Sequence, residues 1–360
     1  MKRFFYYRIL FLLIVGAISF FTGCHSPPVQ PSGGIIPPAA TKEGGSAGND
    51  YDTPPELVLL PEGEDLPVSS FNEIWAYLVS GREEALSLDH PISDLAYFGA
   101  ELDSYGKLID VPDIKKISSF QGRVHLVAAC SGRALTHFAL AEGSPERKAL
   151  IRDLLEAAKP FHGLQIDFEN VPPRDGEAFL SFLKELRAGL GHKIFSVALP
   201  ARTRPLQDDV YDYIKIRPIA DRILVMAYDE HWSTSAPGPI ASMGWCRNVA
   251  LHALETIGTE KLIMGLPFYG RSWGSMNANK AYLYSGIEEI LQEQNIKKIE
   301  RESGIPTFRY NTPLSVTVYF EDAYSLSSRL EMYRKLGVSS VGFWRLGQET
   351  SEFWPLIGIQ

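Results

Sequence analysis

Cysteine is scarce in this sequence of 360 residues, and clustered positive charge is absent from it. Only three cysteines occur, and neither Cys130 nor Cys246 has a His or Cys at metal-ligand spacing, so we expect no metal site. Both cysteines lie in apolar surroundings, which favours buried thiols. A disulfide between them is the alternative if the protein is exported. The sequence contains no basic block and the net charge is −8, which argues against a nucleic-acid partner.

The N-terminal apolar run is too short to span a membrane. It extends from Ile9 to Phe21, whereas a spanning helix needs about 20 residues. The run follows the charged start MKRFFYYR, so we predict a signal peptide over residues 1–23. Small residues precede Cys24 in FTGC, which resembles a bacterial lipobox and implies cleavage before Cys24 and lipid attachment to it. An ordinary signal peptide with an incidental cysteine is the alternative.

Residues 24–69 contain little that could form a core. Pro, Gly, Ser and Ala dominate this segment, so we expect a flexible tether. The globular body is then 70–360. This arrangement predicts a protein of the cell envelope, lipid-anchored to a bacterial membrane on its periplasmic or surface face. We expect a monomer.

The body has no Gly-rich phosphate turn after its first strand-like run and no internal repeat, so nothing indicates a nucleotide cofactor or a solenoid. Short apolar runs instead alternate with amphipathic helical stretches, which predicts parallel strands joined by crossovers. Eight such units suit an α/β fold of the (β/α)8 TIM-barrel type, and we expect no cofactor. A doubly wound open sheet is the alternative. The runs cover 73–81, 93–102, 123–130, 163–169, 194–200, 222–229, 262–270 and 340–347.

Helix boundaries and one insertion can also be predicted. Ser144 with Pro145 indicates a helix start, and Gly191 a helix stop. The segment from Ser272 to about Pro313 interrupts the pattern between the seventh strand and its helix. It contains FRYN and VTVYF, so we expect a small insertion with an antiparallel pair.

Two acids lie in the fourth strand-like run, HGLQIDFEN. Side chains two apart in a strand share a face, so Gln165, Asp167 and Glu169 form one polar stripe. In a TIM barrel the active site lies at the carboxyl ends of the strands, which places Glu169 at the mouth and Asp167 one layer deeper. Buried carboxylates are costly without partners, so a catalytic pair is favoured over an accidental D-x-E.

Four segments resemble motifs of glycoside hydrolase family 18, in the family's order. GLQIDFE resembles the strand-four signature D-G-x-D-x-D-x-E, and MAYD at 226–229 resembles the strand-six M-x-Y-D. GLPFYGRSW at 265–273 resembles the strand-seven G-x-P-x-Y-G-R-x-W, and GFWRLGQE at 342–349 the strand-eight segment that carries a Trp. IDFENVPP, YDEHW and PGPIASMGW further resemble the branch of spore-cortex peptidoglycan hydrolases.

The resemblance implies retaining, substrate-assisted hydrolysis of β-linked N-acetylglucosamine, for which this family departs from the two-carboxylate scheme. By position, Glu169 would be the general acid and base, Asp167 would hold and stabilise the 2-acetamido group, and Tyr228 would donate to its carbonyl oxygen. The implied substrate-binding residues are Asp229, Trp344, Gln165, Tyr269, Arg271 and Trp232.

Two positions depart from the family pattern. His162 and Gln165 replace its first two aspartates. We expect His162 to be structural, at the strand's entrance. A neutral amide at 165 could donate to Asp167, and we therefore expect Asp167 to stay ionised.

The sequence predicts an exported, anchored glycosidase acting on peptidoglycan or its fragments in preference to chitin. A glycan-binding lectin on the same fold is the alternative, although lectins of this family typically lose the terminal Glu. A surface lipoprotein that binds partners independently of sugar is a third possibility.

Overall fold

The computed structural model describes residues 59–63, 65–275, 279–312 and 314–360. The chain divides into two units, Met1–Glu56 and Leu57–Gln360. The predicted signal peptide and the predicted tether up to residue 58 lie outside the described residues. Within the described ranges, no helix has the length and apolar character needed to cross a bilayer.

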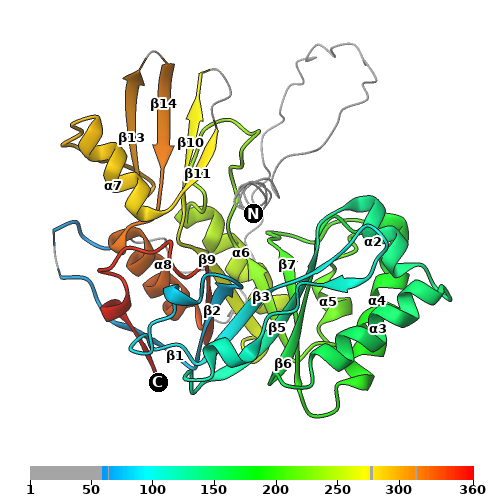
Figure 1. Cartoon of the computed structure of the whole chain (residues 1–360). Coiled ribbons are helices and arrows are strands. Elements are labelled where there is room, and N and C mark those ends of the chain that lie inside the picture. The colour runs from blue at the N-terminus through cyan, green and yellow to red at the C-terminus, as the bar shows by residue number, and fades with distance from the viewer. Residues whose placement is uncertain (1–58, 64, 276–278, 313) are drawn as a thin grey trace, which may run out of the picture. The chain divides into compact units, whose positions relative to one another are not determined.

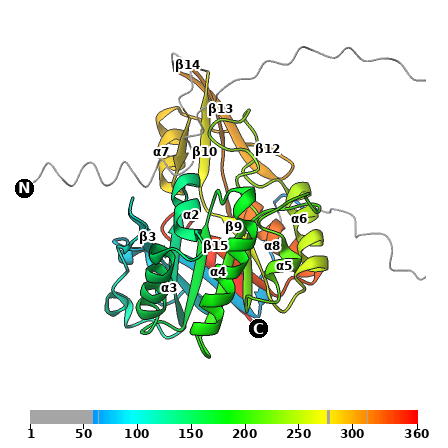
Figure 2. The same cartoon turned by 90° about the vertical axis from the view of Figure 1, so that its right-hand side faces the viewer.

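Eight parallel strands form a closed barrel, with helices outside it (Figures 1 and 2). Every neighbouring pair is parallel, and the pairing of the first strand with the second closes the ring. The (β/α)8 prediction is confirmed, and each strand lies within its predicted run. In chain order the strands are β2 (Glu73–Val79), β3 (Asp94–Leu102), β5 (Arg123–Cys130), β6 (Gly163–Phe168), β7 (Ile194–Pro200), β8 (Arg222–Met226), β9 (Leu262–Pro267) and β15 (Ser340–Trp344).

Alternation along each strand divides the core into two layers. One cluster fills the barrel interior and includes Trp75, Phe98 and Val127. A larger cluster lies between the strands and the helices and includes Leu164 and Ile166. Because both faces of the sheet are covered, the strands read as nearly continuous apolar runs.

The outer helices begin and end largely where the sequence indicates. Helix α3 (Pro145–Ala157) starts after Ser144, whose Oγ accepts from the backbone N–H of Arg147 at 3.1 Å. Helix α4 ends at Gly189, with Gly191 in the left-handed region just beyond. The other elements are β1 (Ser69–Phe71), β4 (Leu108–Ile109), α2 (Arg133–Leu140), α4 (Gly176–Gly189), α5 (Tyr213–Ile216), α6 (Met243–Thr256), α8 (Ala323–Leu336) and β16 (Ile357–Ile359), with short 3-10 turns at Glu83–Ala85, Ile114–Ile117, Pro173–Asp175 and Trp354–Leu356.

The insertion is larger than the sequence predicts. It is a five-stranded antiparallel sheet with one helix, rising from one end of the barrel (Figures 1 and 2). The predicted pairing of FRYN with VTVYF is confirmed, since Phe308 lies opposite Val318. The strands before this pair carry too few apolar residues to stand out in the sequence. The elements are β10 (Gly270–Gly274), β11 (Lys280–Tyr282), α7 (Tyr284–Glu293), β12 (Glu300–Glu302), β13 (Ile305–Thr312) and β14 (Leu314–Tyr319).

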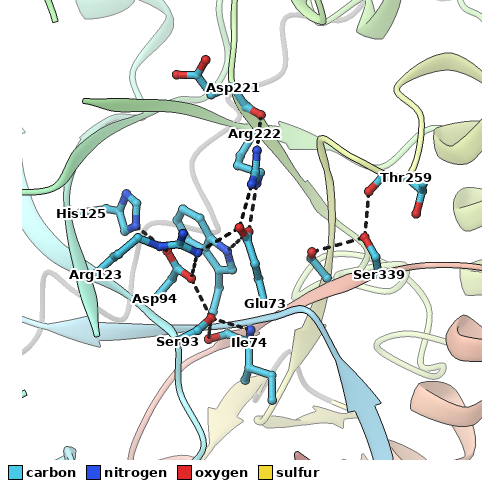
Figure 3. A network of polar contacts seen from close by, with 12 residues as sticks. Glu73, Ile74, Ser93, Asp94, Arg123, His125, Asp221, Arg222, Thr259 and Ser339 are labelled. Atoms are coloured by element: carbon cyan, nitrogen blue, oxygen red, sulfur yellow. Dashed lines mark hydrogen bonds and ion pairs between the residues drawn. The ribbon is translucent and has the colours of Figure 1, made fainter. Parts of the chain in front are cut away.

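Paired charges close the end of the barrel where the strands begin. Glu73 accepts hydrogen bonds from Arg222 at 2.7 Å and from Arg123 at 2.9 Å, so it lies between two guanidinium groups (Figure 3). Asp94 binds the other side of Arg123 at 2.7 Å and the ring of His125 at 2.8 Å. These ion pairs occupy the end where the strands begin, so the opposite end is the one that we examine for a ligand site.

A second ion pair lies deep in the protein. Arg329 of α8 binds Glu321 at 3.0 Å, and the two residues are 0% and 2% exposed. Arg329 also donates to the carbonyl of Ala241 at 2.6 Å, which ties α8 to the segment before α6. Arg329 thus holds α8 against the segment that leads into α6.

Replacing Glu321 with glutamine is expected to lower the free energy of unfolding by about 3–5 kcal/mol, because it leaves the buried guanidinium without a counter-charge. Glu331→Gln is the matched control, since Glu331 binds Arg334 at 2.8 Å at the surface. That change should cost at most about 1 kcal/mol. Denaturant unfolding of both variants measures the difference, and equal losses would contradict the prediction.

Candidate active site

Strand β6 carries the polar stripe that the sequence predicts. Leu164, Ile166 and Phe168 pack in the outer cluster, so Gln165 and Asp167 face the barrel interior. Asp167 is 8% exposed, whereas Glu169 follows the strand end and is half-buried. The backbone N–H of Glu169 donates to the carbonyl of Cys130 at 2.7 Å, which fixes the residue at the mouth.

Burial raises the pKa of both acids. The pKa of Asp167 is well above its usual value because the carboxyl is buried and Glu169 lies close. Burial and the charge of Asp229 raise the pKa of Glu169. Among the described residues, Oδ1 of Asp167 has no hydrogen-bond partner. Two adjacent carboxyls with raised pKa values retain a proton where isolated carboxyls would have lost it, which suits a general acid.

Gln165 does not play the part that the sequence suggests. The Tyr77 hydroxyl donates to its Oε1, and its Nε2 donates to Ser196 Oγ at 3.2 Å. Within the described chain, no hydrogen bond joins Gln165 to Asp167. The expectation that an amide hydrogen bond keeps Asp167 ionised is therefore wrong for this structure. Gln165 is also fully buried beneath Asp167, so it is a support rather than a substrate contact.

Tyr228 and Asp229 lie just beyond β8, on the same side of the barrel. The pKa of the Tyr228 phenol lies well above its usual value, mainly because the phenol is buried and also because Tyr77 and Asp167 are near. The phenol therefore remains a hydrogen-bond donor. Asp229 accepts from the Tyr269 hydroxyl at 2.5 Å and from Arg271 at 3.2 Å. Tyr269 and Arg271 therefore position Asp229, and Arg271 does so as its ion-pair partner.

The two predicted tryptophans lie in different surroundings. The Trp344 ring packs edge-on against Tyr77 and Phe98, each with centroids 5.2 Å apart, and it is half-buried at the mouth. Trp232 is 50% exposed in the loop after β8, and its indole N–H donates to Thr234 at 2.8 Å. Its carbonyl accepts from Trp273 of the insertion at 3.2 Å, so the loop that presents it is held in place.

A groove of about 640 Å³ lies beside the acids. Glu169, Tyr228 and Asp229 line it, together with the loop that follows β7. The sequence gives no motif for this loop. Its Tyr211 hydroxyl donates to the Phe168 carbonyl at 2.9 Å and accepts from a backbone N–H at 2.9 Å, which fastens the loop to the end of β6. A second hollow of about 540 Å³ lies between α3 and α4 and contains none of the motif residues.

The remaining sequence predictions concern structural residues. His162 accepts a hydrogen bond from the backbone N–H of Val124 at 3.0 Å, at the entrance of β6, as expected. Cys130 and Cys246 are free and buried, so the reading of two thiols is confirmed. Cys24 lies outside the described residues.

Gly265 of β9 gives Tyr228 its space. A Cβ at this position would lie 2.7 Å from the carbonyl oxygen of Val225 and 3.1 Å from the Tyr228 ring. Gly265→Ala is expected to displace Tyr228 and to reduce catalytic turnover at least tenfold, with a loss of about 1–3 kcal/mol in the free energy of unfolding. Gly244→Ala is the control, because nothing lies within 4 Å of its Cβ. Steady-state kinetics and denaturant unfolding test this, and wild-type kcat in Gly265→Ala would refute it.

Comparisons with known proteins agree with this geometry. The model of the family "Glycosyl hydrolases family 18" matches residues 89–349. An uncharacterized glycosylase, YvbX of Bacillus subtilis, is 28% identical over 224 residues, or 59% of this chain and 65% of its own length. The cortical fragment-lytic enzyme of Bacillus subtilis is 28% identical over 233 residues, or 59% of this chain and 53% of its own.

A solved structure supports the fold. The spore cortex-lytic enzyme SleL of Bacillus cereus has a TM-score of 0.72 at 23% identity, covering 84% of this chain and 77% of that one. This chain spans between half and two thirds of the length of the two curated relatives. The family model alone matches well over half of the chain. The chain therefore belongs to the glycosyl hydrolases of family 18.

Proposed function

We propose that this protein is an exported, membrane-anchored glycosidase that hydrolyses β-linked N-acetylglucosamine glycans. The observation that carries the proposal is the pair of Asp167 and Glu169. Both acids have raised pKa values, they lie at the open end of the barrel, and Tyr228 stands beside them. Membership of a glycosidase family agrees with this.

The proposed reaction is substrate-assisted and retains the anomeric configuration. Glu169 protonates the glycosidic oxygen while the carbonyl oxygen of the substrate's own 2-acetamido group attacks the anomeric carbon. An oxazolinium ion forms and the leaving sugar departs. Glu169, now ionised, takes a proton from water, which opens the ring and restores the acid. Asp167 holds the acetamido N–H and stabilises the positive charge, and Tyr228 donates to the acetyl oxygen.

Two further contacts complete the proposal. Trp344 provides an apolar floor for the reacting sugar, since its half-buried ring belongs to the last residue of β15, at the carboxyl end of the barrel strands. Trp232 offers an exposed aromatic face for a more distant sugar. Asp229, fixed by Tyr269 and Arg271, accepts a hydrogen bond from sugar or from Glu169.

Peptidoglycan or its fragments are the proposed substrate, in preference to chitin. Relatives named as cortical fragment-lytic enzymes support this choice, and so does the predicted envelope location. Incubating the purified protein with cell-wall sacculi and, separately, with chitin tests it. New reducing ends on N-acetylglucosamine in sacculi digests, identified by mass spectrometry, are expected. Preferential release from chitin would overturn the substrate choice, and glycan binding without any cleavage would favour the lectin alternative.

The anchor is a separate proposal. We expect lipid on Cys24, which would place the protein in the membrane fraction of a bacterial host. Cys24→Ala should move it to the soluble fraction and abolish labelling by a radioactive fatty acid. Unchanged fractionation of the variant would contradict the anchor without bearing on catalysis.

A further inference from the structure

Strand β3 contains one more residue than its partner β5 at the open end of the barrel. Phe98 pairs with Val127 and Ala100 pairs with Ala128, so Gly99 has no place in the ladder. Such a bulge shifts the register by one residue and re-aims the side chains that follow it.

The bulge turns Glu101 into the barrel. Phe98 belongs to the interior cluster, whereas Ala100 and Leu102 belong to the outer one. Glu101 lies between the last two and so faces inward. Its partner in the ladder, Ala129, also packs against the interior cluster. Unbroken alternation from Phe98 would have turned Glu101 toward the helices.

Only glycine fits at the bulge. A Cβ on Gly99 would lie 2.8 Å from the Cβ of Ser80 and 3.0 Å from the ring of Pro112. The inward direction of Glu101 thus depends on a residue without a side chain.

Glu101 lies level with Asp167. It pairs with Ala129, and Ala129 pairs with Asp167, so the three residues form one row across β3, β5 and β6. With strands spaced by about 4.8 Å, the Cα atoms of Glu101 and Asp167 are about 10 Å apart. Ala129 is small and half-buried although it faces inward, so the space above it is open.

The carboxyl of Glu101 has no hydrogen-bonding partner in the part of the chain that the structure describes. No hydrogen bond or ion pair of its side chain occurs among the described residues, and it is half-buried. Burial and the nearby Asp110 raise its pKa. Below it, Phe98 contacts the ring of Trp344, which is the proposed sugar floor. The groove is lined by residues at the ends of β6, β7 and β8 and in the segments that follow these strands. A half-buried carboxyl that faces a site without a protein partner is suited to bind a ligand.

We propose that Glu101 determines specificity by accepting a hydrogen bond from a hydroxyl group of the sugar next to the reacting one, on the β3 side of Trp344. This inference rests on the proposed glycosidase function. A carboxyl oxygen is a strong acceptor for sugar hydroxyls, and no other acid of the described chain stands in this row between β3 and β6.

Kinetics with the tetramer of N-acetylglucosamine test the proposal. Glu101→Ala should lower kcat/KM about tenfold, mainly through KM, because a charged hydrogen bond to a bound sugar is lost. Glu101→Gln keeps an acceptor of the same size and should lose less. The exposed Glu142, changed to Ala, is the control and should behave as wild type.

Three results would overturn the assignment. The first is a kcat/KM of Glu101→Ala within twofold of wild type. The second is a reduced kcat of Glu101→Ala at unchanged KM. The third is a reduced kcat/KM of Glu101→Ala together with a lowered unfolding midpoint of Glu101→Gln. If wild type cleaves neither the tetramer nor cell-wall sacculi, the proposed function fails instead. Cleavage of sacculi alone leaves the proposed function standing. Calorimetric titration with the tetramer then decides on Glu101, since equal affinities of wild type and Glu101→Ala would refute it.

Discussion

Glu169→Gln is expected to lower kcat at least 1000-fold while leaving the affinity for glycan nearly unchanged. The amide keeps the shape and hydrogen-bonding reach of Glu169 but cannot transfer a proton, and a positioned general acid contributes about 10²–10⁴-fold to the rate. The mutation removes an interaction made in the transition state, so kcat and kcat/KM should fall together.

The raised pKa of Glu169 gives this experiment a second readout. Wild-type activity should decline as pH rises through the elevated pKa, because the acid form that protonates the leaving oxygen is then lost. The residual activity of Glu169→Gln should not follow that decline. Glu177→Gln, an exposed glutamate of α4, is the control for expression and folding. Wild-type turnover in Glu169→Gln would remove Glu169 from the role of acid.

Most of the barrel could be predicted because its strands are buried on both faces. Mainly apolar runs, such as those in Asp94–Leu102 and Ile194–Pro200, stand out against the amphipathic helices between them. The same burial made the polar residues of β6 conspicuous. Their order along the strand was enough to place Asp167 inside and Glu169 at the mouth.

Features that depend on a neighbouring strand could not be predicted. The bulge at Gly99 reverses the alternation of inward and outward side chains along β3. A pattern of period two therefore predicts the wrong direction for Glu101. Spacing alone would allow Gln165 to donate to Asp167. Instead Gln165 binds Tyr77, which comes from the non-adjacent strand β2, and Ser196, its ladder partner on the neighbouring strand β7. The insertion was underestimated because short strands such as Lys280–Tyr282 are stabilised by their partners rather than by their own composition.

Asp167→Asn is expected to reduce kcat at least 100-fold and yet to stabilise the protein at neutral pH. The activity is lost because asparagine has no proton to release, so it cannot become the carboxylate that balances the positive charge of the oxazolinium ion. Removing one electrostatic stabiliser costs about 10²–10³-fold. The stability gain comes from the buried carboxyl, whose Oδ1 has no partner among the described residues.

The direction of the pH effect follows from the raised pKa of Asp167. Above the ordinary value near 3.9, the unfolded chain has released a proton that the folded protein still holds, so the free energy of unfolding falls as pH rises toward the folded pKa. Asparagine carries no such proton. The unfolding midpoints of variant and wild type should therefore converge near pH 4 and diverge above it, with the variant higher by about 2 °C or more.

Asp209→Asn is a control for which we expect a change in stability opposite in sign to that of Asp167→Asn. Burial works against ionisation of Asp209, but hydrogen bonds from Arg202 outweigh it and lower the pKa. That variant should be less stable than wild type at neutral pH, and the difference should vanish in acid as Asp209 protonates. Thermal unfolding of the three proteins between pH 3 and pH 8 measures both effects. If Asp167→Asn were destabilised at every pH, Asp167 would be held by contacts that require its charge, and the folded protein would then keep it ionised.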